Sequence, residues 1–254
     1  NTTLAGALAA VKLGIKTVHV EACLRSFNRI MPEEINRIVA DHVCDLLLAP
    51  TAKAMENAKN EGLLKKTHLV GDIMVDSLRF GLAKAEKDSR VLRRLGLEDT
   101  EYCLLTLHRP YNVDDPQQLH RILEGLNHLR RLIIFPVHPR TRNILHNSNI
   151  TSYGNIRFIE PQAYLDFLSL MQHAQVILSD SGGIQKEAYI LKKPCVTLRY
   201  ETEWVETVAS GWNLLLPVND PAFPEAIREF RPPEAQPEIF GSQVAEKMAK
   251  LISA

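Results

Sequence analysis

The feature that most constrains the fold is a repeated alternation of short apolar runs with longer helical stretches. The runs have almost no polar alternation, which is typical of strands covered on both faces. They occupy residues 17–20, 45–49, 68–70, 102–105, 132–135, 156–159, 176–178 and 195–198. Helical stretches such as 51–62, 117–129 and 164–173 lie between them. Such alternation predicts an α/β fold with parallel sheets and right-handed crossovers.

Length and composition predict two domains. A chain of 254 residues with 45% apolar content is long enough for more than one core. The polar stretch 83–100, rich in Lys, Glu and Arg, separates two groups of strand–helix units. We therefore expect an N-terminal domain over 1–82, a linker over 83–100 and a C-terminal domain over 101–240. A last helix over 241–254 completes the expected organisation.

Charge and cysteine usage exclude several classes of function. Thirty Lys and Arg balance thirty Asp and Glu, so no net field recruits nucleic acid or an anionic membrane. No run approaches the roughly 20 apolar residues of a membrane span. The four cysteines lie far apart, without the paired spacing of a zinc, iron–sulfur or redox site. We expect buried free thiols in a cytoplasmic protein with no metal.

The clearest local signal is a strand, a small-residue turn and a helix over residues 176–188. Ser181, Gly182 and Gly183 form the turn. Two glycines let a phosphate approach the backbone, and the first N–H groups of a helix have no internal partner. The position at a strand's carboxyl end favours a diphosphate site in the C-terminal domain. A tight strand-to-helix turn without a ligand is the alternative.

Three side chains near this turn are further candidates. Glu187 lies one helical turn beyond Gly183, where a carboxylate reaches ribose hydroxyls, although an acidic residue early in a helix is also ordinary. Arg199 follows the strand that ends at Leu198 and is a candidate for the same crevice. Phe167 either stacks on a base or belongs to the core.

Two histidines occupy matching positions after two strands. His108 follows the run that ends at Leu107, and His138 follows the run that ends at Phe135 by the same kind of short step. Side chains so placed converge on one edge of a parallel sheet. They predict donors for a diphosphate or a carrier for a proton.

Carboxylates follow the first strand of the N-terminal domain. Glu21 has no evident local structural role there, and Arg25 lies in the same loop. Glu33 and Glu34 come after Pro32 at the start of a helix, where acidic residues are favoured for structural reasons alone. Glu21 is therefore the sharper functional prediction.

Taken in order, these motifs resemble the signature set of the non-hydrolysing UDP-N-acetylglucosamine 2-epimerase family. The matching segments are 19–25, 32–37, 108–110, 136–139, 180–188 and 202–206. The resemblance implies a glycosyltransferase-B-like fold of two Rossmann-like domains, with the final helix over 241–254 returning to the first domain. It also implies interconversion of UDP-N-acetylglucosamine (UDP-GlcNAc) and UDP-N-acetylmannosamine (UDP-ManNAc) without metal or nicotinamide. A homodimer is expected by the same analogy.

The resemblance also implies residue roles. Glu21 and Glu33 match the acid/base carboxylates, and His108 matches the residue that contacts the diphosphate. The remaining matches are phosphate binding by Ser181, Gly182 and Gly183, ribose binding by Glu187, uracil contact by Phe167, and lining of the site by Arg25, His138, Arg199 and Glu203.

The chain departs from the family pattern in three places. The family has a Gly-Asp pair directly before the segment that matches Thr2-Thr3, and its aspartate is catalytic. We therefore expect the first domain to be incomplete and the chain as given to be inactive. Cys23 stands at a usual glycine, and Tyr111 stands where glutamate is frequent. Two other readings stay open: a hydrolysing relative that releases N-acetylmannosamine and UDP, and a protein that only binds UDP-sugars.

Overall fold

The computed structural model describes residues 1–148, 150, 153–220 and 223–253, with Arg140 described for its backbone only. The chain divides into two compact units. Unit 1 comprises Asn1–Ser77 with Pro237–Ala254, and unit 2 comprises Leu78–Gln236. Across the described ranges, no helix is both long and apolar enough to cross a membrane.

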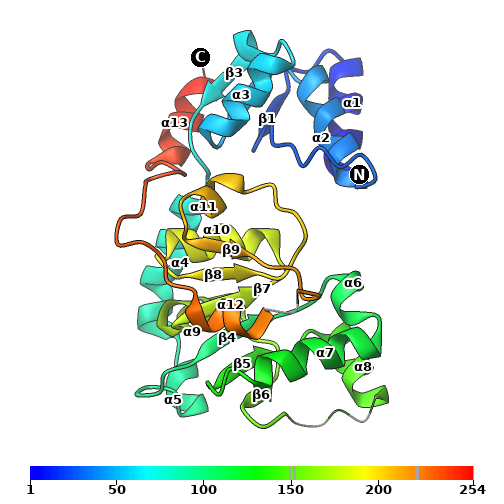
Figure 1. The fold of residues 1–254 in the computed structure, drawn as a ribbon. Coiled ribbons are helices and arrows are strands. Elements are labelled where there is room, and N and C mark those ends of the chain that lie inside the picture. The colour runs from blue at the N-terminus through cyan, green and yellow to red at the C-terminus, as the bar shows by residue number, and fades with distance from the viewer. Residues whose placement is uncertain (149, 151–152, 221–222, 254) are drawn as a thin grey trace. The chain divides into compact units, whose positions relative to one another are not determined.

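Unit 2 is built on a parallel sheet of six strands in the order β6-β5-β4-β7-β8-β9 (Figure 1). The strands are β4 (Cys103–Thr106), β5 (Ile133–Pro136), β6 (Ile156–Ile159), β7 (Val176–Ser179), β8 (Cys195–Thr197) and β9 (Asn213–Leu215). These strands pair in parallel, from Cys103 opposite Ile133 and Val176 to Thr197 opposite Leu215. This is the strand order of a doubly wound nucleotide-binding fold. The predicted α/β class with parallel sheets is confirmed.

Helices cover both faces of this sheet. The helices of unit 2 are α5 (Val91–Leu95), α6 (Pro110–Val113), α7 (Pro116–Asn127), α8 (Pro139–Asn147), α9 (Tyr164–His173), α10 (Gly182–Ile190), α11 (Val205–Ala209) and α12 (Phe223–Glu229), together with most of α4 (Met74–Asp88). Buried residues of α7, α8 and α12 share one core cluster, and those of α4, α5, α9 and α10 share another.

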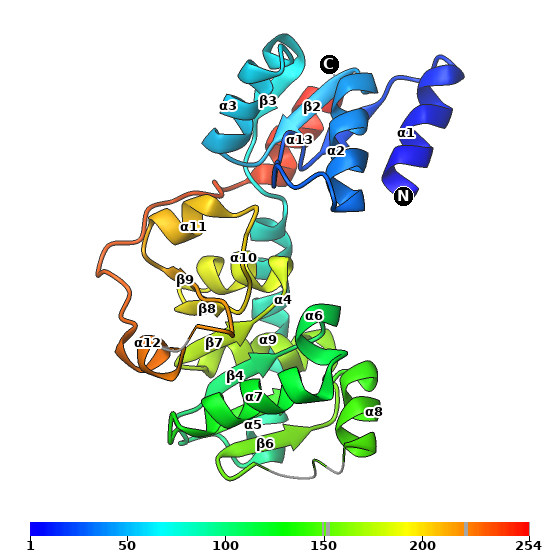
Figure 2. The same cartoon turned by 45° about the vertical axis from the view of Figure 1, so that its right-hand side comes forward.

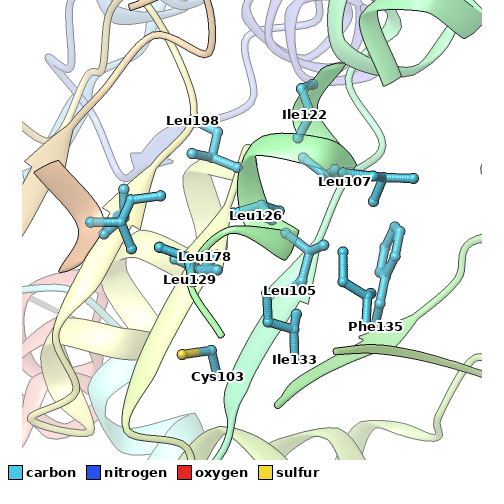
Figure 3. Packing of buried hydrophobic residues seen from close by; sticks show 14 of the residues in the cluster. Cys103, Leu105, Leu107, Ile122, Leu126, Leu129, Ile133, Phe135, Leu178 and Leu198 are labelled. Carbon is cyan, nitrogen blue, oxygen red and sulfur yellow. The ribbon is translucent and has the colours of Figure 1, made fainter. Parts of the chain in front are cut away.

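The apolar strands feed these two clusters alternately. Cys103 and Leu105 pack in the first cluster, which Figure 3 shows with Phe135 among its members, whereas Leu104 packs in the second. Successive strand side chains point to opposite faces, so a continuous apolar run serves both cores. This explains why the strands carry no polar alternation.

Unit 1 contains a smaller parallel sheet, β1 (Val18–Val20), β2 (Leu46–Ala49) and β3 (Thr67–Leu69). Its helices are α1 (Thr2–Lys12), α2 (Pro32–Val43), α3 (Ala52–Asn60) and α13 (Val244–Ile252), with a short 3₁₀ turn at Leu64–Lys66. α13 packs through Val244 and Met248 on Leu48 of β2, and Figure 2 shows it behind this sheet. Residues from the end of the chain therefore complete the core of unit 1.

Two features of the fold differ from the sequence expectations. The stretch 83–100, expected as a linker, contains the last six residues of α4 and all of α5. Its polar residues cover an exposed face, while Ala85, Val91 and Leu97 are buried in the core of unit 2. Strand β9 was not predicted, because its short run Asn213–Leu215 follows a turn and begins with a polar residue.

Candidate functional site

The loops that follow β4 and β7 meet where the strand order of unit 2 reverses. β4 lies between β5 and β7, so the chain leaves β4 toward one side of the sheet and later returns on the other. Open parallel sheets bind ligands beyond the carboxyl ends of their strands at such a point. The backbone N–H of His108, after β4, donates to Asp180, after β7. The fold thus brings together two loops that the sequence singled out separately.

Asp180 organises the contacts between these loops. Its side chain is fully buried and accepts hydrogen bonds from the backbone N–H groups of His108 at 3.1 Å and Arg109 at 2.9 Å. Asn112 Nδ2 donates to the same carboxylate at 3.1 Å. Burial alone raises the pKa of Asp180, but the hydrogen bonds from His108, Arg109 and Asn112 outweigh it and hold the pKa below its usual value. Asp180 is therefore ionised at neutral pH.

The same carboxylate orients the imidazole of His108. Nδ1 of His108 lies 3.1 Å from Oδ1 of Asp180, and the histidine side chain is 40% exposed. An ionised carboxylate accepts hydrogen bonds only, so the contact assigns the ring hydrogen to Nδ1. In the neutral ring Nε2 then carries the lone pair. Fixing the tautomer in this way prepares a histidine to exchange a proton or hold an anion.

The start of α10 combines two glycines with backbone N–H groups that the Ser181 side chain does not cap. Ser181 is the N-cap residue, and its side chain makes no capping hydrogen bond. A methyl group on Gly182 would lie 2.6 Å from Oε1 of Glu203, closer than side chains approach one another. A methyl group on Gly183 would meet nothing nearer than Ser181 Oγ at 4.0 Å. Gly182 thus leaves room for the Glu203 carboxylate, whereas Gly183 faces open space beside the positive end of the helix dipole.

A buried arginine stands beside this helix start. Arg199 is 5% exposed, and its Nη1 lies 3.3 Å from Oε2 of Glu203 and 3.5 Å from the methyl position of Gly182. Burial raises the pKa of Tyr111 above its usual value, and the nearby Arg199 guanidinium opposes this shift. Tyr111, where the chain departs from the family pattern, therefore lies near the predicted site residue Arg199.

The remaining predicted residues of unit 2 have different surroundings. Glu187 is buried in α10, and burial raises its pKa despite the nearby Lys186 and the hydrogen bond with Tyr164. Phe167 is partly buried on α9 and packs against the second core cluster of unit 2. His138 is exposed, two residues after β5.

A buried polar network supports the segment that carries Arg199 and Glu203. Gln185 Oε1 accepts hydrogen bonds from Thr202 Oγ1 at 2.7 Å and from Asn213 Nδ2 at 3.1 Å. Asn213 in turn accepts from Thr197 Oγ1 at 2.7 Å. Satisfied buried networks of this kind hold a single arrangement of the chain. The sequence alone assigns no role to Asp180, Asn112 or Gln185. The one available signal is the position of Asp180, an acidic residue directly between β7 and the turn that contains the glycines.

In unit 1, Glu21 and Arg25 lie in the loop after β1. Glu21 has φ of 59° and Cys23 has φ of 64°, a left-handed conformation that costs L-residues about 1–2 kcal/mol each. The Arg25 side chain is 1% exposed. It donates to both oxygens of Glu61 at 2.7 Å, and its Nη1 donates to Asp41 at 2.7 Å. All three guanidinium nitrogens therefore bind residues of unit 1. The contact between Arg25 and a ligand stays a prediction.

The two adjacent glutamates of α2 have opposite environments. Glu33 is exposed in the first turn. Glu34 is 1% exposed and accepts hydrogen bonds from the N–H groups of Ser26 at 2.9 Å and Phe27 at 3.0 Å. The structural explanation that the sequence left open for both residues therefore applies to Glu34, and Glu33 is the accessible carboxylate.

All four cysteines are buried and unpaired, as predicted. Burial raises the pKa of Cys23 and of Cys195 to about 12, so both thiols are protonated at neutral pH. In the part of the chain that the structure describes, no group of three or more His, Cys, Asp or Glu side chains is arranged to hold a metal ion.

Comparison with known proteins agrees on one family. The family model described as UDP-N-acetylglucosamine 2-epimerase matches residues 1–252. A Methanococcus maripaludis protein named UDP-N-acetylglucosamine 2-epimerase homolog is 48% identical over 91% of this chain. The UDP-2,3-diacetamido-2,3-dideoxy-D-glucuronate 2-epimerase of Pseudomonas aeruginosa is 42% identical over 99% of it. The chain spans 66% and 73% of the length of these two relatives.

A solved structure shows the same fold. It is the Methanocaldococcus jannaschii UDP-GlcNAc 2-epimerase in complex with UDP-GlcNAc and UDP, which is 42% identical and superimposes with a TM-score of 0.89. The match covers 99% of this chain and 73% of that one. The fold is therefore glycosyltransferase-B-like, as predicted, and the chain belongs to the UDP-N-acetylglucosamine 2-epimerase family.

Proposed function

We propose that the full-length protein interconverts UDP-GlcNAc and UDP-ManNAc by elimination and re-addition of UDP. The observation that carries the proposal is the pair of loops joined by Asp180 at the strand-order reversal of unit 2. These loops place an oriented histidine beside a glycine-rich helix start in a member of this family. The solved Methanocaldococcus jannaschii relative holds UDP-GlcNAc and UDP.

In this proposal unit 2 binds the UDP moiety. Ser181, Gly182 and Gly183 are assigned to the diphosphate, with the open space at Gly183 admitting an oxygen close to the backbone. The Ser181 N–H donates to Ser179 Oγ at 3.0 Å, so the proposed backbone donors are those of the two glycines. With both ring nitrogens protonated, His108 donates from Nδ1 to Asp180 and from Nε2 to the diphosphate, and so stabilises the charge as UDP departs. The other assigned roles are ribose binding by Glu187, uracil contact by Phe167, and lining of the site by His138, Arg199 and Glu203.

The chemistry requires carboxylates that move a proton at carbon 2 of the sugar. One carboxylate removes that proton, and its electron pair forms the carbon 1–carbon 2 double bond. The carbon 1–oxygen bond breaks, and its electrons leave with UDP. Re-addition of UDP, with protonation of carbon 2 on the other face, gives the epimer. Glu21 and Glu33 are assigned to these transfers, with Arg25 nearby in sequence.

Turnover in heavy water tests the proposal. We expect the full-length protein to convert UDP-GlcNAc to UDP-ManNAc with deuterium at carbon 2 of the recovered sugar nucleotides, measured by proton NMR. Release of free N-acetylmannosamine and UDP would identify a hydrolysing enzyme instead. Binding of UDP without any deuterium incorporation would identify a protein that only binds the nucleotide.

A second substrate class has support from one comparison. The Pseudomonas aeruginosa relative, named for a diacetamido sugar acid, matches over 99% of this chain. A competition assay with UDP-GlcNAc and that UDP-sugar acid decides between the two. Faster deuterium incorporation into UDP-GlcNAc supports the first proposal, and faster incorporation into the sugar acid supports the second.

Assembly and location complete the proposal. We place the protein in the cytoplasm as a homodimer, by analogy with the family and from its charge and hydropathy. Light scattering of the purified full-length protein tests the assembly, with twice the chain mass expected and a single chain mass contradicting it.

A further inference from the structure

The loop between β1 and α2 holds a shape that its own residues disfavour. Glu21, Cys23 and Phe27 have φ values of 59°, 64° and 59°, in the left-handed region that favours glycine. Such conformations persist only where surrounding contacts determine them. The contacts that hold this loop therefore also decide where Glu21 is presented.

Two buried carboxylates on α2 supply these contacts. Asp41 is fully buried, lies 2.6 Å from His19 Nδ1, and accepts hydrogen bonds from the Cys23 N–H at 3.0 Å and from Arg25 Nη1 at 2.7 Å. Glu34 binds the N–H groups of the next two loop residues, as described above. Asp41 thus holds the first half of the loop, and Glu34 holds the second.

The spacing on α2 explains how one helix does both. Glu34 and Asp41 lie seven residues apart, so they project from one face of the helix about two turns from each other. Glu33, in the first turn of the same helix, is exposed. The helix that carries one proposed proton-transfer carboxylate therefore also fixes the loop that carries the other.

We infer that Asp41 is a positioning residue for the proposed epimerisation. It sets the direction of Glu21 by holding Cys23 and His19, without touching the substrate itself. The inference rests on the proposed function, because the assignment of Glu21 does. An aspartate is required at this position because its neighbours in the loop are hydrogen-bond donors, and an amide in its place turns a donor toward them.

Asp41→Asn is the direct test, with Glu61→Gln as the matched control. Glu61 also pairs with Arg25, but within the described part of the chain it forms no hydrogen bond to the backbone of residues 21–23. We expect Asp41→Asn to lower kcat for UDP-ManNAc formation about 10- to 100-fold, since small displacements of a reacting group are this costly. KM and the Kd for UDP should stay within about twofold, and Glu61→Gln should keep the wild-type kcat.

Cys23→Gly separates positioning from general stability. Glycine adopts the conformation of Cys23 without strain, so the loop depends less on Asp41. We expect the double variant, Cys23→Gly with Asp41→Asn, to recover kcat to within about threefold of Cys23→Gly alone. A merely structural role of Asp41 predicts no such recovery.

Amide hydrogen exchange tests whether Asp41 and Glu34 hold the loop, and it needs neither turnover nor a variant. The N–H groups of Cys23, Ser26 and Phe27 should exchange at least about tenfold more slowly than unprotected loop amides in the wild-type protein. An unprotected Cys23 amide overturns the inference, even if Asp41→Asn fails to fold, because Cys23 is the backbone N–H that donates to Asp41. The Ser26 and Phe27 amides, which donate to Glu34, report on the second half of the loop. Wild-type kcat in Asp41→Asn overturns it as well. A wild-type protein with no turnover instead rejects the proposed function, so the two failures are distinguishable.

Discussion

Each unit of the molecule has a fully buried aspartate that fixes the loop after a parallel strand. Different partners stabilise the negative charge of the two carboxylates. Asp180 in unit 2 accepts from backbone N–H groups, an asparagine and an imidazole. Asp41 in unit 1 accepts from one backbone N–H and an imidazole, and pairs with the buried guanidinium of Arg25. A buried aspartate therefore organises both loops, although one is suited to binding an anion and the other carries an acidic side chain.

The difference shows what each loop can present. Around Asp180, hydrogen bonds without a paired arginine stabilise the carboxylate, and α10 begins with donors beside open space at Gly183. In unit 1, the ion pair between Asp41 and Arg25 holds a loop in which Glu21 and Cys23 have left-handed backbone conformations. This loop carries the Glu21 carboxylate. Unit 2 is thus suited to binding an anion, and unit 1 is suited to holding an acidic side chain in a strained position.

The largest expected effect tests whether Asp180 is the organising residue of unit 2. Asp180→Asn should lower the free energy of unfolding by about 3 kcal/mol, because buried donors lose their acceptor. It should also weaken UDP binding at least about 100-fold, since both loops of the site shift. Urea unfolding is measurable from Trp204 and Trp212, the two tryptophans of the sequence, which both lie in unit 2. A change below about 0.5 kcal/mol contradicts the role.

Acid sharpens the same comparison. The pKa of Asp180 is lower in the folded protein than in the unfolded chain, so its ionisation stabilises the fold above the unfolded pKa of about 3.9. This contribution is lost as pH falls through the folded value. The stability difference between wild type and Asp180→Asn should therefore be constant near neutral pH and shrink below about pH 4. A difference that grows with acid contradicts the assignment, and urea titrations at several pH values decide it.

The adjacent glycines of α10 provide an intermediate effect with an internal control. Gly182→Ala forces the Glu203 carboxylate away and should destabilise unit 2 by about 1 kcal/mol. Gly183→Ala meets open space and should stabilise it by about 0.4–1 kcal/mol through the unfolded state. Its methyl group fills the space proposed for the diphosphate, so UDP affinity should fall about tenfold. Stronger UDP binding by Gly183→Ala would place the anion elsewhere.

The smallest expected effect concerns Glu187, a buried carboxylate of unit 2 whose charge burial disfavours. Its raised pKa means that its ionisation costs stability, and this cost grows as pH rises through the folded value. Glu187→Gln should therefore raise the free energy of unfolding at pH 8 by about 0.5–1 kcal/mol. UDP binding should weaken at the same time if Glu187 holds the ribose. Unchanged affinity in calorimetry would remove that role.

Much of the fold was predictable because the apolar runs of unit 2 are continuous and their helices are well separated in sequence. The sequence does not predict β9 because its run is short, and it predicts a linker over 83–100 because the charges there obscure the buried Ala85, Val91 and Leu97. The glycine turn and the histidine loop were visible as local patterns. Their connection through Asp180 was not, because it joins residues about 70 positions apart in sequence. The burial of Arg25 and the strain at Cys23 likewise depend on tertiary contacts.

A comparison of UDP with uridine tests the central claim most directly. If the start of α10 and the loop fixed by Asp180 hold the diphosphate, UDP should bind at least about 100-fold more tightly than uridine. In NMR titrations the amide signals of Ser181, Gly182, Gly183 and His108 should move with UDP and stay unchanged with uridine. Equal affinities, or UDP-dependent shifts confined to other parts of unit 2, would contradict the account.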